Sequence, residues 1–518
     1  MAARAQPVSP WPGLGAAAIV AALILGTLLA VAWRADAAVR FGGADWAALR
    51  FTLLQAVLSS VLSVALAVPV ARALARRRFA GRHVLIALLG APFILPVIVA
   101  ILGLLTVFGR AGWISAALGA IDLPPLSIYG LHGVVLAHVF FNLPLATRLL
   151  LQGWQDVPGE RFRMAATLGV DGWAMWRLIE VPMLLRVVPG ALAVIFALCL
   201  TSFAVALTLG GGPRATTIEL AIYQAFRFDF DLGRAAMLSG VQLLLTGIAA
   251  WCALKAGQGD GFGAGLDRAV RRWDGTGAGA RMLDVLWVGL AALFLLLPLS
   301  AIVLAGLGSL GGLPGVVWQA VLVSLGVSVA STALVLLLAV PMAATVALGR
   351  GRAVEMAGIL GLAASPLVIG TGLFIMVYRV ADPAVLALPV TALVNALMAL
   401  PFALRILVPQ AREVVARYGR LGLSLDMAGG PFLRHVLLPR MRAQIGFAAG
   451  LAAALSMGDL GVIALFADPD TATLPLQVYR LMGAYRMDDA AGAALLLLIL
   501  SMGAFWTLDR GGRWNAEA

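Results

Sequence analysis

Long apolar runs separated by short polar segments make up most of this chain. A helix needs about 20 apolar residues to cross the roughly 30 Å hydrocarbon core of a bilayer, and about twelve runs reach that length. The first run is longer than a signal-peptide core of about 7–15 residues, so we expect an uncleaved span. The pattern predicts an all-α integral membrane protein. Its expected spans are 13–33, 51–72, 84–108, 130–151, 187–209, 235–254, 283–306, 316–347, 355–378, 384–408, 441–466 and 490–508.

The composition agrees with a chain whose main solvent is the lipid bilayer. Hydrophobic residues make up 62% of the 518 residues and charged residues 12%, and the mean hydropathy is +0.99. A soluble protein of this size needs more polar surface. The net charge of +12 does not indicate nucleic acid, because the basic residues lie between apolar runs and not in a patch with interleaved aromatics. Cys199 and Cys252 fall inside apolar runs and predict neither a disulfide nor a metal site.

The basic residues also predict an orientation. With the N-terminus in the cytoplasm, 27 of the 37 basic residues fall on the cytoplasmic side when each is assigned to its nearest loop. Cytoplasmic loops of membrane proteins carry an excess of Arg and Lys. We therefore expect both termini in the cytoplasm.

A stretch of 41 residues occurs twice, at 142–182 and again at 399–439. Each copy begins at the end of an apolar helix, continues through about thirty polar, Arg-rich residues and enters another apolar helix after a proline. A repeat of this length in constant register indicates two equivalent units. With an even number of spans in each half, the units are expected to run parallel, related by an axis along the membrane normal. At the offset of 257, Pro144 falls on Pro401, Arg148 on Arg405, Arg177 on Arg434 and Pro182 on Pro439. Outside the loop the likeness continues at other offsets: LAVP at 66–69 recurs at 338–341, Ala-Pro at 91–92 corresponds to Ser-Pro at 365–366, and Tyr223 corresponds to Tyr479.

The boundary between the halves is a polar, Gly-rich stretch, typical of a flexible linker. We expect it, like both copies of the repeated loop, in the cytoplasm. The predicted layout is an N-terminal helix and loop at 1–50, a first repeat domain at 51–255, the linker at 256–281, a helix and loop at 282–315, a second repeat domain at 316–510 and a tail at 511–518.

The sequence offers no catalytic machinery of its own. Its single lysine, Lys255, is followed by Ala, so no G-x-x-x-x-G-K-[ST] phosphate loop is present. The four histidines are scattered, no metal-binding spacing occurs, and we expect neither a cofactor nor an enzymatic activity. Energy for transport would then come from a partner or an ion gradient. An ion-coupled carrier usually buries ionisable residues in the membrane, and Asp459 is the one acidic residue that we place well inside a span, so this second class stays open.

The paired loops resemble the EAA loops of binding-protein-dependent ABC-importer permeases, whose approximate pattern is E-A-A-x-x-x-G, nine variable residues and I-x-L-P. Arg163 and Met164 replace the leading Glu-Ala in the first copy, and Asp426 replaces the glycine in the second. The matching positions are Ala165, Gly169, Ile179 and Pro182 in the first copy and Leu438 and Pro439 in the second, where Val436 stands at the Ile position.

The resemblance implies that each loop folds as a short coupling helix seated in a groove of a separate ATP-hydrolysing subunit. Glycine permits the turn between two short helices, and arginines with an apolar face give an amphipathic surface for a partner. The alternative is a basic helix lying on anionic headgroups. The expected coupling residues are Arg161, Arg163, Ala165, Gly169, Arg177, Pro182, Arg417, Arg420, Asp426, Arg434 and Pro439.

Over most of its length the chain is similar to the thiamine ABC-transporter permeases, a fused two-unit subfamily. The stretches 201–238 and 456–491 carry this similarity, together with the twelve-span layout. It implies import of thiamine and its phosphates across the bacterial inner membrane, with a periplasmic thiamine-binding protein as donor and an ATPase dimer as motor. The fused ferric-iron importer permeases share the architecture, but the spans show no cluster of Asp, Glu and Tyr suited to a hard cation.

Two further sets of residues are candidates for contact with donor and cargo. Segments 210–234 and 467–489 carry Asp and Arg with Tyr or Phe, and we expect them to dock the binding protein; the alternative is a solvated loop. Polar residues at equivalent depth in the two halves are candidates for the path and for a cationic thiazolium, with a structural hydrogen bond between helices as the alternative. These residues are Thr201, Ser202, Ser456 and Asp459.

Overall fold

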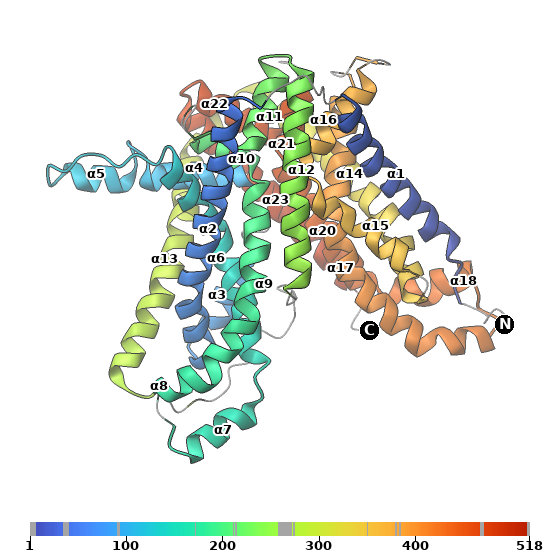
Figure 1. The fold of residues 1–518 in the computed structure, drawn as a ribbon, viewed down its shortest axis with the longest axis horizontal. Coiled ribbons are helices and arrows are strands. Elements are labelled where there is room, and N and C mark those ends of the chain that lie inside the picture. Colours follow the sequence, from blue (N-terminus) through green and yellow to red (C-terminus); the bar gives the residue numbers. More distant parts are fainter. Residues whose placement is uncertain are drawn as a thin grey trace.

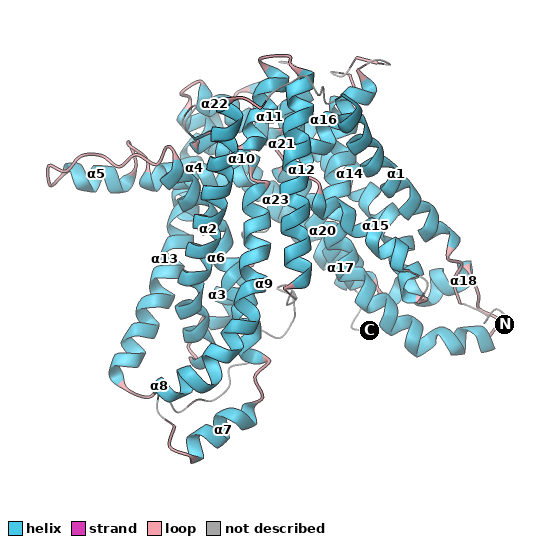
Figure 2. Ribbon diagram, viewed as in Figure 1, coloured by secondary structure: helices cyan, strands magenta, loops and turns pink. Residues whose placement is uncertain are grey.

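The computed structural model describes residues 7–34, 41–90, 94–170, 172–210, 212, 215–256, 272, 275–349, 351–378, 381–382, 385–466 and 471–514. Every regular element in these ranges is a helix (Figure 2). Eleven helices are long and apolar enough to cross a membrane, or up to twelve when a bent pair counts as one span. The predicted all-α membrane fold of about twelve spans is confirmed.

The helices of the first half are α1 (Trp11–Arg34), α2 (Gly43–Arg76), α3 (Arg82–Leu88), α4 (Val97–Phe108), α5 (Trp113–Gly119), α6 (Leu131–Gln155), α7 (Gly159–Thr167), α8 (Gly172–Met175), η2 (Trp176–Glu180), α9 (Val181–Leu200), α10 (Phe203–Leu209), α11 (Ile218–Arg227) and α12 (Leu232–Lys255). Those of the second half are α13 (Ala278–Ser309), η4 (Leu310–Gly312), α14 (Gly315–Ala347), α15 (Arg352–Ala363), α16 (Pro366–Val377), α17 (Ala387–Ser424), α18 (Gly430–Phe432), η5 (Leu433–Leu437), α19 (Leu438–Arg440), α20 (Arg442–Gly458), α21 (Gly461–Phe466), α22 (Leu474–Gly483) and α23 (Met487–Arg513).

The two halves interlock through the first helix of each. Helix α1 packs on α14, α15 and α16 of the second half, and α13 packs on α2 and α4 of the first half as well as on α23 (Figure 1). Glycines allow the close approach: a Cβ added at Gly372 would lie 2.5 Å from the carbonyl oxygen of Thr27, and one at Gly103 would lie 2.5 Å from that of Pro298. Small residues at such crossings let helix backbones touch in a membrane. The linker of 256–281 lies largely in residues 257–271 and 273–274, outside the described part.

The predicted spans 187–209 and 441–466 are each two helices in the structure. The first divides at Thr201 and Ser202 into α9 and α10, and the second divides at Asp459 and Leu460 into α20 and α21. At the repeat offset of 257 the two breaks overlap at one position, Ser202 and Asp459. An apolar pattern does not reveal such a break, because the residues on both sides of it are equally hydrophobic.

The predicted spans 84–108 and 355–378 are also divided. The second turns by 93° between α15 and α16. Ser365 caps α16 by accepting a hydrogen bond on its Oγ from the backbone N–H of Val368 (3.2 Å), and Pro366 is the first helical residue, a position that suits its missing N–H. The first divides into α3 and α4; Ala-Pro at 91–92, which the repeat pairs with Ser-Pro at 365–366, lies outside the described residues.

Helix α17 extends well beyond the predicted span 384–408, because it continues to Ser424. In the first copy the corresponding helix α6 ends at Gln155, and α7 follows as a separate helix. Pro158 caps the start of α7, and its ring and missing N–H disfavour a continuous helix there, although α17 accommodates Pro401 and Pro409. Val415 stands at the equivalent position of the second copy, where the helix continues.

Candidate functional site

Both copies of the repeated loop lie at one end of the molecule. Helices α7, α8 and α18 occupy the end opposite to α11 and α22 (Figure 1). The described ends of the chain reach the same region: the backbone N–H of Gly429 donates to the carbonyl oxygen of Pro7 (2.8 Å), and the backbones of Gly446 and Gly512 are in close contact. The fold thus places the two loops and both chain ends on one side, which the sequence predicted to be the cytoplasm.

The first loop turns at the end of α7 in a Schellman motif. The N–H of Val170 donates to the carbonyl of Ala165 (3.0 Å), and the N–H of Gly169 donates to that of Ala166 (3.2 Å). Gly169 has a φ of +64°, a left-handed conformation that glycine adopts without a steric penalty. This glycine therefore serves the turn.

The second loop makes the same turn although Asp426 replaces the glycine. The N–H of Met427 donates to the carbonyl of Gly422 (2.8 Å), and the N–H of Asp426 donates to that of Leu423 (3.2 Å), which are the bonds of the first loop shifted by 257 residues. The φ of Asp426 is +55°. Aspartate tolerates this region better than most residues, so the two loops keep one shape at some energetic cost in the second.

This cost predicts opposite effects of two exchanges. Asp426→Gly is expected to raise the free energy of unfolding by about 0.5 kcal/mol, and Gly169→Ala to lower it by roughly 1–2 kcal/mol, because an L-residue is strained at positive φ. Thermal unfolding of the purified protein in detergent measures both. Gly430→Ala is the control, since a Cβ there meets nothing within 4 Å and φ is not positive. Equal effects of all three exchanges would contradict the assignment.

Each loop re-enters the bundle through a turn of π-helix. The elements η2 and η5 coincide at the offset of 257, and in each the N–H of the following residue donates five positions back. Pro182 and Pro439 come next, and neither has an N–H to donate to the carbonyl four positions earlier. A π turn followed by proline therefore recurs in both halves, and single π turns are frequent at functional sites.

The predicted coupling residues are nearly all at the surface. Arg163 pairs with Glu160 (3.0 Å), but both side chains are well exposed, so the pair contributes little to stability. Ala165 differs, because it is buried on the inner face of α7, and its carbonyl accepts the N–H of Val170 in the turn. The exposed members are Arg161, Arg163, Gly169, Arg177, Pro182, Arg417, Arg420, Asp426, Arg434 and Pro439.

Two apolar side chains on each loop were missed by the sequence analysis. Met164 and Leu168 project from the first loop, and Leu421 and Leu425 project from the equivalent positions of the second, all between 55% and 73% exposed. A spacing of four residues puts each pair on one face of its helix. Exposed apolar patches that recur in this way indicate a surface that binds a partner. The sequence could have revealed these pairs, because they recur at the 257-residue offset of the repeat.

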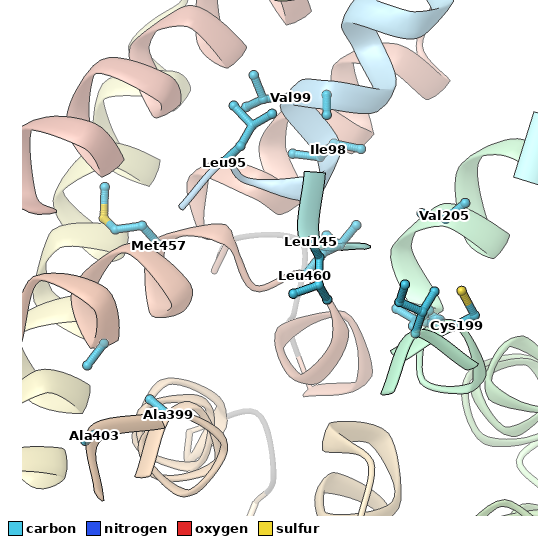
Figure 3. Close-up of a cluster of buried hydrophobic side chains, with 14 of the residues drawn as sticks. Leu95, Ile98, Val99, Leu145, Cys199, Val205, Ala399, Ala403, Met457 and Leu460 are labelled. Atoms are coloured by element: carbon cyan, nitrogen blue, oxygen red, sulfur yellow. The ribbon is translucent and has the colours of Figure 1, made fainter. Parts of the chain in front are cut away.

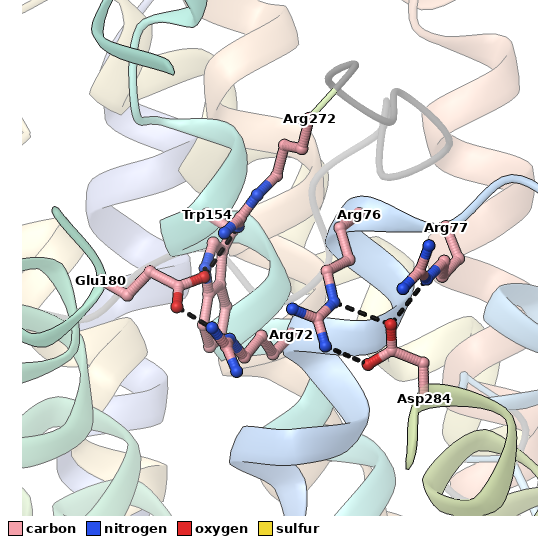
Figure 4. A network of polar contacts seen from close by, with 7 residues as sticks. All are labelled: Arg72, Arg76, Arg77, Trp154, Glu180, Arg272 and Asp284. Carbon is pink, nitrogen blue, oxygen red and sulfur yellow. Dashed lines mark hydrogen bonds and ion pairs between the residues drawn. The ribbon is translucent and has the colours of Figure 1, made fainter. Parts of the chain in front are cut away.

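A buried carboxylate fixes the first loop to the bundle. Glu180, at the end of η2, is fully buried and accepts hydrogen bonds from Arg72 Nε (2.7 Å), Arg272 Nη1 (2.7 Å) and Trp154 Nε1 (3.1 Å) (Figure 4). Arg272 belongs to the predicted linker, so the linker is tied directly to the loop. We call these contacts of Glu180 the clamp. Leu437 occupies the position of Glu180 in the second half and has no carboxylate to make them.

A second carboxylate extends the network toward α13. Asp284 accepts hydrogen bonds from Arg76 Nε (2.8 Å) and Arg77 Nε (2.6 Å), and it is buried (Figure 4). Arg272 also lies over the ring of Phe162 at 4.9 Å. The loop, the end of α2, the linker and the start of α13 therefore form one connected unit.

The predicted path residues lie at the two breaks and beside them. Thr201 and Ser202 form the first break, and Asp459 belongs to the second. Ser456 is buried and accepts a hydrogen bond from Asn395 Nδ2 of α17 (3.1 Å), which is the arrangement of a structural bond between helices. Side chains flanking the second break, Met457 and Leu460, belong to a buried cluster that draws on both halves (Figure 3).

At the opposite end of the molecule, each half presents an exposed aromatic residue just before its last long helix. Phe230 and Tyr485 each lie two residues before the next long helix, and they are 81% and 92% exposed. Both have positive φ, of 51° and 59°. Arg234 of the same region is engaged by Asp45 (2.8 Å) and Asp229 (3.2 Å). Residues 211, 213–214 and 467–470 of the predicted docking segments lie outside the described part.

Comparison with known proteins gives whole-length relatives, while no family model matches the chain. It is 39% identical over 530 residues to the thiamine transport system permease protein ThiP of Escherichia coli, with 98% of each chain covered. It is 40% identical to ThiP of Salmonella typhimurium, again with 98% of each covered, and 39% identical to ThiP of Brucella abortus, with 98% of this chain and 96% of the relative covered. The predicted resemblance is thereby confirmed: this multi-pass membrane protein belongs to the family of thiamine transport system permease proteins.

Proposed function

We propose that the chain is the membrane-spanning permease subunit of an ATP-driven importer that moves thiamine and its phosphates from a periplasmic binding protein to the cytoplasm. The observation that carries the proposal is the whole-length similarity to transport permeases named for thiamine. The chain itself performs no catalysis in this proposal; a separate ATPase dimer hydrolyses ATP. The membrane is the bacterial inner membrane, with both termini in the cytoplasm.

The paired loops are the proposed contact with the ATPase dimer. Two equal turns, each bearing one exposed apolar pair and exposed arginines, suit two equal grooves on a two-fold partner. The exposed pairs are Met164 with Leu168 and Leu421 with Leu425. The predicted arginines are exposed on the same loops and would supply the polar contacts at the edge of the interface.

Helices α9 and α20 connect these loops to the interior of the bundle. Helix α9 runs without interruption from the π turn to the break over 20 residues, or about 30 Å. In the second half the short helix α19 and a turn at Met441 follow the π turn, and α20 then reaches the break over 17 residues, or about 25 Å. A displacement of the loop by the ATPase would therefore reach the breaks at Thr201 and Asp459. Breaks between helical segments are positions where a backbone can absorb a change of direction. Alternating access would follow from coupled movement at both.

The exposed aromatics Phe230 and Tyr485 are the proposed contacts for the binding protein. Bulky residues at positive φ carry a steric cost, and such strain tends to persist at functional sites. Aromatic residues also dominate the energetics of protein interfaces. With one such residue from each half, the binding protein would contact the permease at two points.

Removing both rings tests this contact. The double variant Phe230→Ala with Tyr485→Ala is expected to reduce donor-dependent stimulation of ATP hydrolysis about tenfold or more, because each truncated interface ring costs about 1–2 kcal/mol or more. Phe230→Tyr with Tyr485→Phe keeps both rings and should retain the stimulation. An unchanged response in the alanine variant would exclude these residues from docking.

The function itself is tested by uptake in vesicles that carry the full complex. Labelled thiamine should accumulate only when ATP and the binding protein are supplied, and an ATPase should co-purify with the chain. Uptake of ferric iron in place of thiamine would favour the iron importers. Thiamine uptake driven by an ion gradient without ATP would favour a secondary carrier and overturn the proposal.

A further inference from the structure

The second helix break contains a carboxylate that is incompletely satisfied. Asp459 follows α20, and its Oδ1 accepts a hydrogen bond from the backbone N–H of Gly461 (3.2 Å). Its Oδ2 is buried, and no described residue donates to it or forms an ion pair with the side chain. Leaving a buried charged acceptor without a partner costs more than the roughly 1–3 kcal/mol of a neutral group. The arrangement is suited to an additional, positively charged partner.

Aromatic rings of the first half lie next to this carboxylate. A Cβ built at Gly461 would lie 3.7 Å from both Oδ1 of Asp459 and Cδ1 of Phe203, so the carboxylate and the ring flank the same glycine. The ring of Phe203 meets that of Tyr223 at 5.2 Å between centroids. Tyr223 in turn meets Phe228 at 5.8 Å, and Phe228 is exposed at the end of the molecule that carries α11 and α22 (Figure 1). The rings form a continuous series from the surface to the break.

The repeat shows that this site is built from different residues in the two halves. At the offset of 257, Ser202 corresponds to Asp459 and Phe203 corresponds to Leu460. One half thus supplies the charge and the other supplies the ring. Ser202 and Asp459 retain accessible surface, whereas Phe203 and Leu460 beside them are buried. A site with this asymmetry fits a ligand that is itself asymmetric and carries one charged ring.

We propose that Asp459, Phe203 and Tyr223 form a binding site for the cationic heteroaromatic ring of the cargo as it passes between the halves. The inference rests on the proposed function, in which the ring is the thiazolium of thiamine. A quaternary ring nitrogen has no N–H to donate, so recognition depends on charge and on aromatic faces. A carboxylate supplies the charge, and the faces of Phe and Tyr attract a cation more strongly when water is excluded. A cargo without a cationic ring would gain nothing from this pair of features.

A purely structural role for Asp459 makes a different prediction. The side chain also accepts the N–H of Gly461, the first residue of α21, and the Oδ1 of an asparagine can accept the same bond. Asp459→Asn therefore keeps the size and the Oδ1 acceptor while it removes the charge. If this hydrogen bond is the whole role, uptake should be unchanged in this variant. If the carboxylate binds the cationic ring, uptake should fall.

The experiment uses the full complex in vesicles and two probes, thiamine and an uncharged analogue in which a neutral ring replaces the thiazolium. The wild type should prefer thiamine, and Asp459→Asn should lower thiamine uptake about tenfold or more while the preference over the neutral analogue largely disappears. Glu355→Gln is the control, because it removes a half-exposed carboxylate outside the site, and it should keep both the uptake and the preference. Co-purification of the ATPase with both variants shows that the complexes are assembled.

Phe203 provides an independent variant. Phe203→Tyr should keep the preference, and Phe203→Leu, the residue of the equivalent position, should weaken it. Gly461→Ala has room for its methyl group but places it between ring and carboxylate, and it should also reduce uptake. If Asp459→Asn keeps the preference for thiamine, the proposed binding site is wrong. If Asp459→Asn does not assemble, the same result in Phe203→Leu excludes the site. Absence of thiamine uptake in the wild type would instead overturn the proposed function.

Discussion

Glu180→Ala is expected to lower the free energy of unfolding by about 3–5 kcal/mol, the largest effect that we predict for a single exchange. The carboxylate is fully buried, and it is shared by Arg72, Arg272 and Trp154. Removing one member of a buried ion cluster leaves the remaining charges buried and uncompensated, and this lowers the free energy of unfolding strongly. The loss is large even where replacing the whole cluster by apolar residues would change the stability little. The first loop would lose its attachment to α2 and to the linker.

Thermal and denaturant unfolding of the purified protein measure this effect, and limited proteolysis near residues 156–176 reports local loosening of the loop. Glu160→Ala is the control. It removes a carboxylate from the same loop, but its partner Arg163 is exposed, and surface pairs of this kind contribute about 0–1 kcal/mol. A stability of Glu180→Ala within about 0.5 kcal/mol of the control would contradict the predicted clamp.

The second large effect is expected at the loop surface. Charging the exposed apolar pair of one loop, as in Met164→Asp with Leu168→Asp, should weaken binding of the ATPase about 10- to 100-fold or more. Burying a side chain such as Leu or Met contributes about 1.5–3 kcal/mol, and an aspartate at an interface adds a desolvation cost. The stability of the isolated subunit should change little, because both side chains are exposed.

Co-purification and ATP hydrolysis measure this loss. The equivalent exchange in the second loop, Leu421→Asp with Leu425→Asp, shows whether both loops contribute equally. Tyr485→Asp is the control: it also charges an exposed apolar surface, but at the opposite end of the molecule, and it should leave the ATPase bound. Retention of the ATPase by both loop variants would contradict the proposed interface.

The backbone conformation of the loops could be predicted where prolines and the 257-residue offset between the two copies determine it. Pro182 and Pro439 mark the two π turns, and the offset of 257 carries the turn at Gly169 onto Asp426. The replacement of glycine by Asp426 did not change the turn, because the same backbone hydrogen bonds form in both loops. Pro158 was equally visible in the sequence, and it separates α7 from α6 where the second copy stays continuous.

The remaining features depend on contacts that no local pattern contains. The clamp joins Arg72, Glu180 and Arg272, which lie far apart in the sequence and meet only in the folded bundle. Likewise, Phe203 and Asp459 come from different halves and are brought together by the packing of α11 on α10 and α21. The breaks next to them were missed because hydrophobicity alone predicts continuous helices.

The interlocking of α1 with the second half has a consequence for how the protein is made. During synthesis α1 is inserted first, yet its main packing surface includes α14, which begins at Gly315. At about 5–20 residues per second the ribosome needs roughly 15–60 s to reach that point. Throughout this interval the face of α1 that carries Ala16, Val20 and Ile24 must be covered by lipid or by the insertion machinery. Biogenesis of the bundle can therefore be completed only after the chain has passed its midpoint.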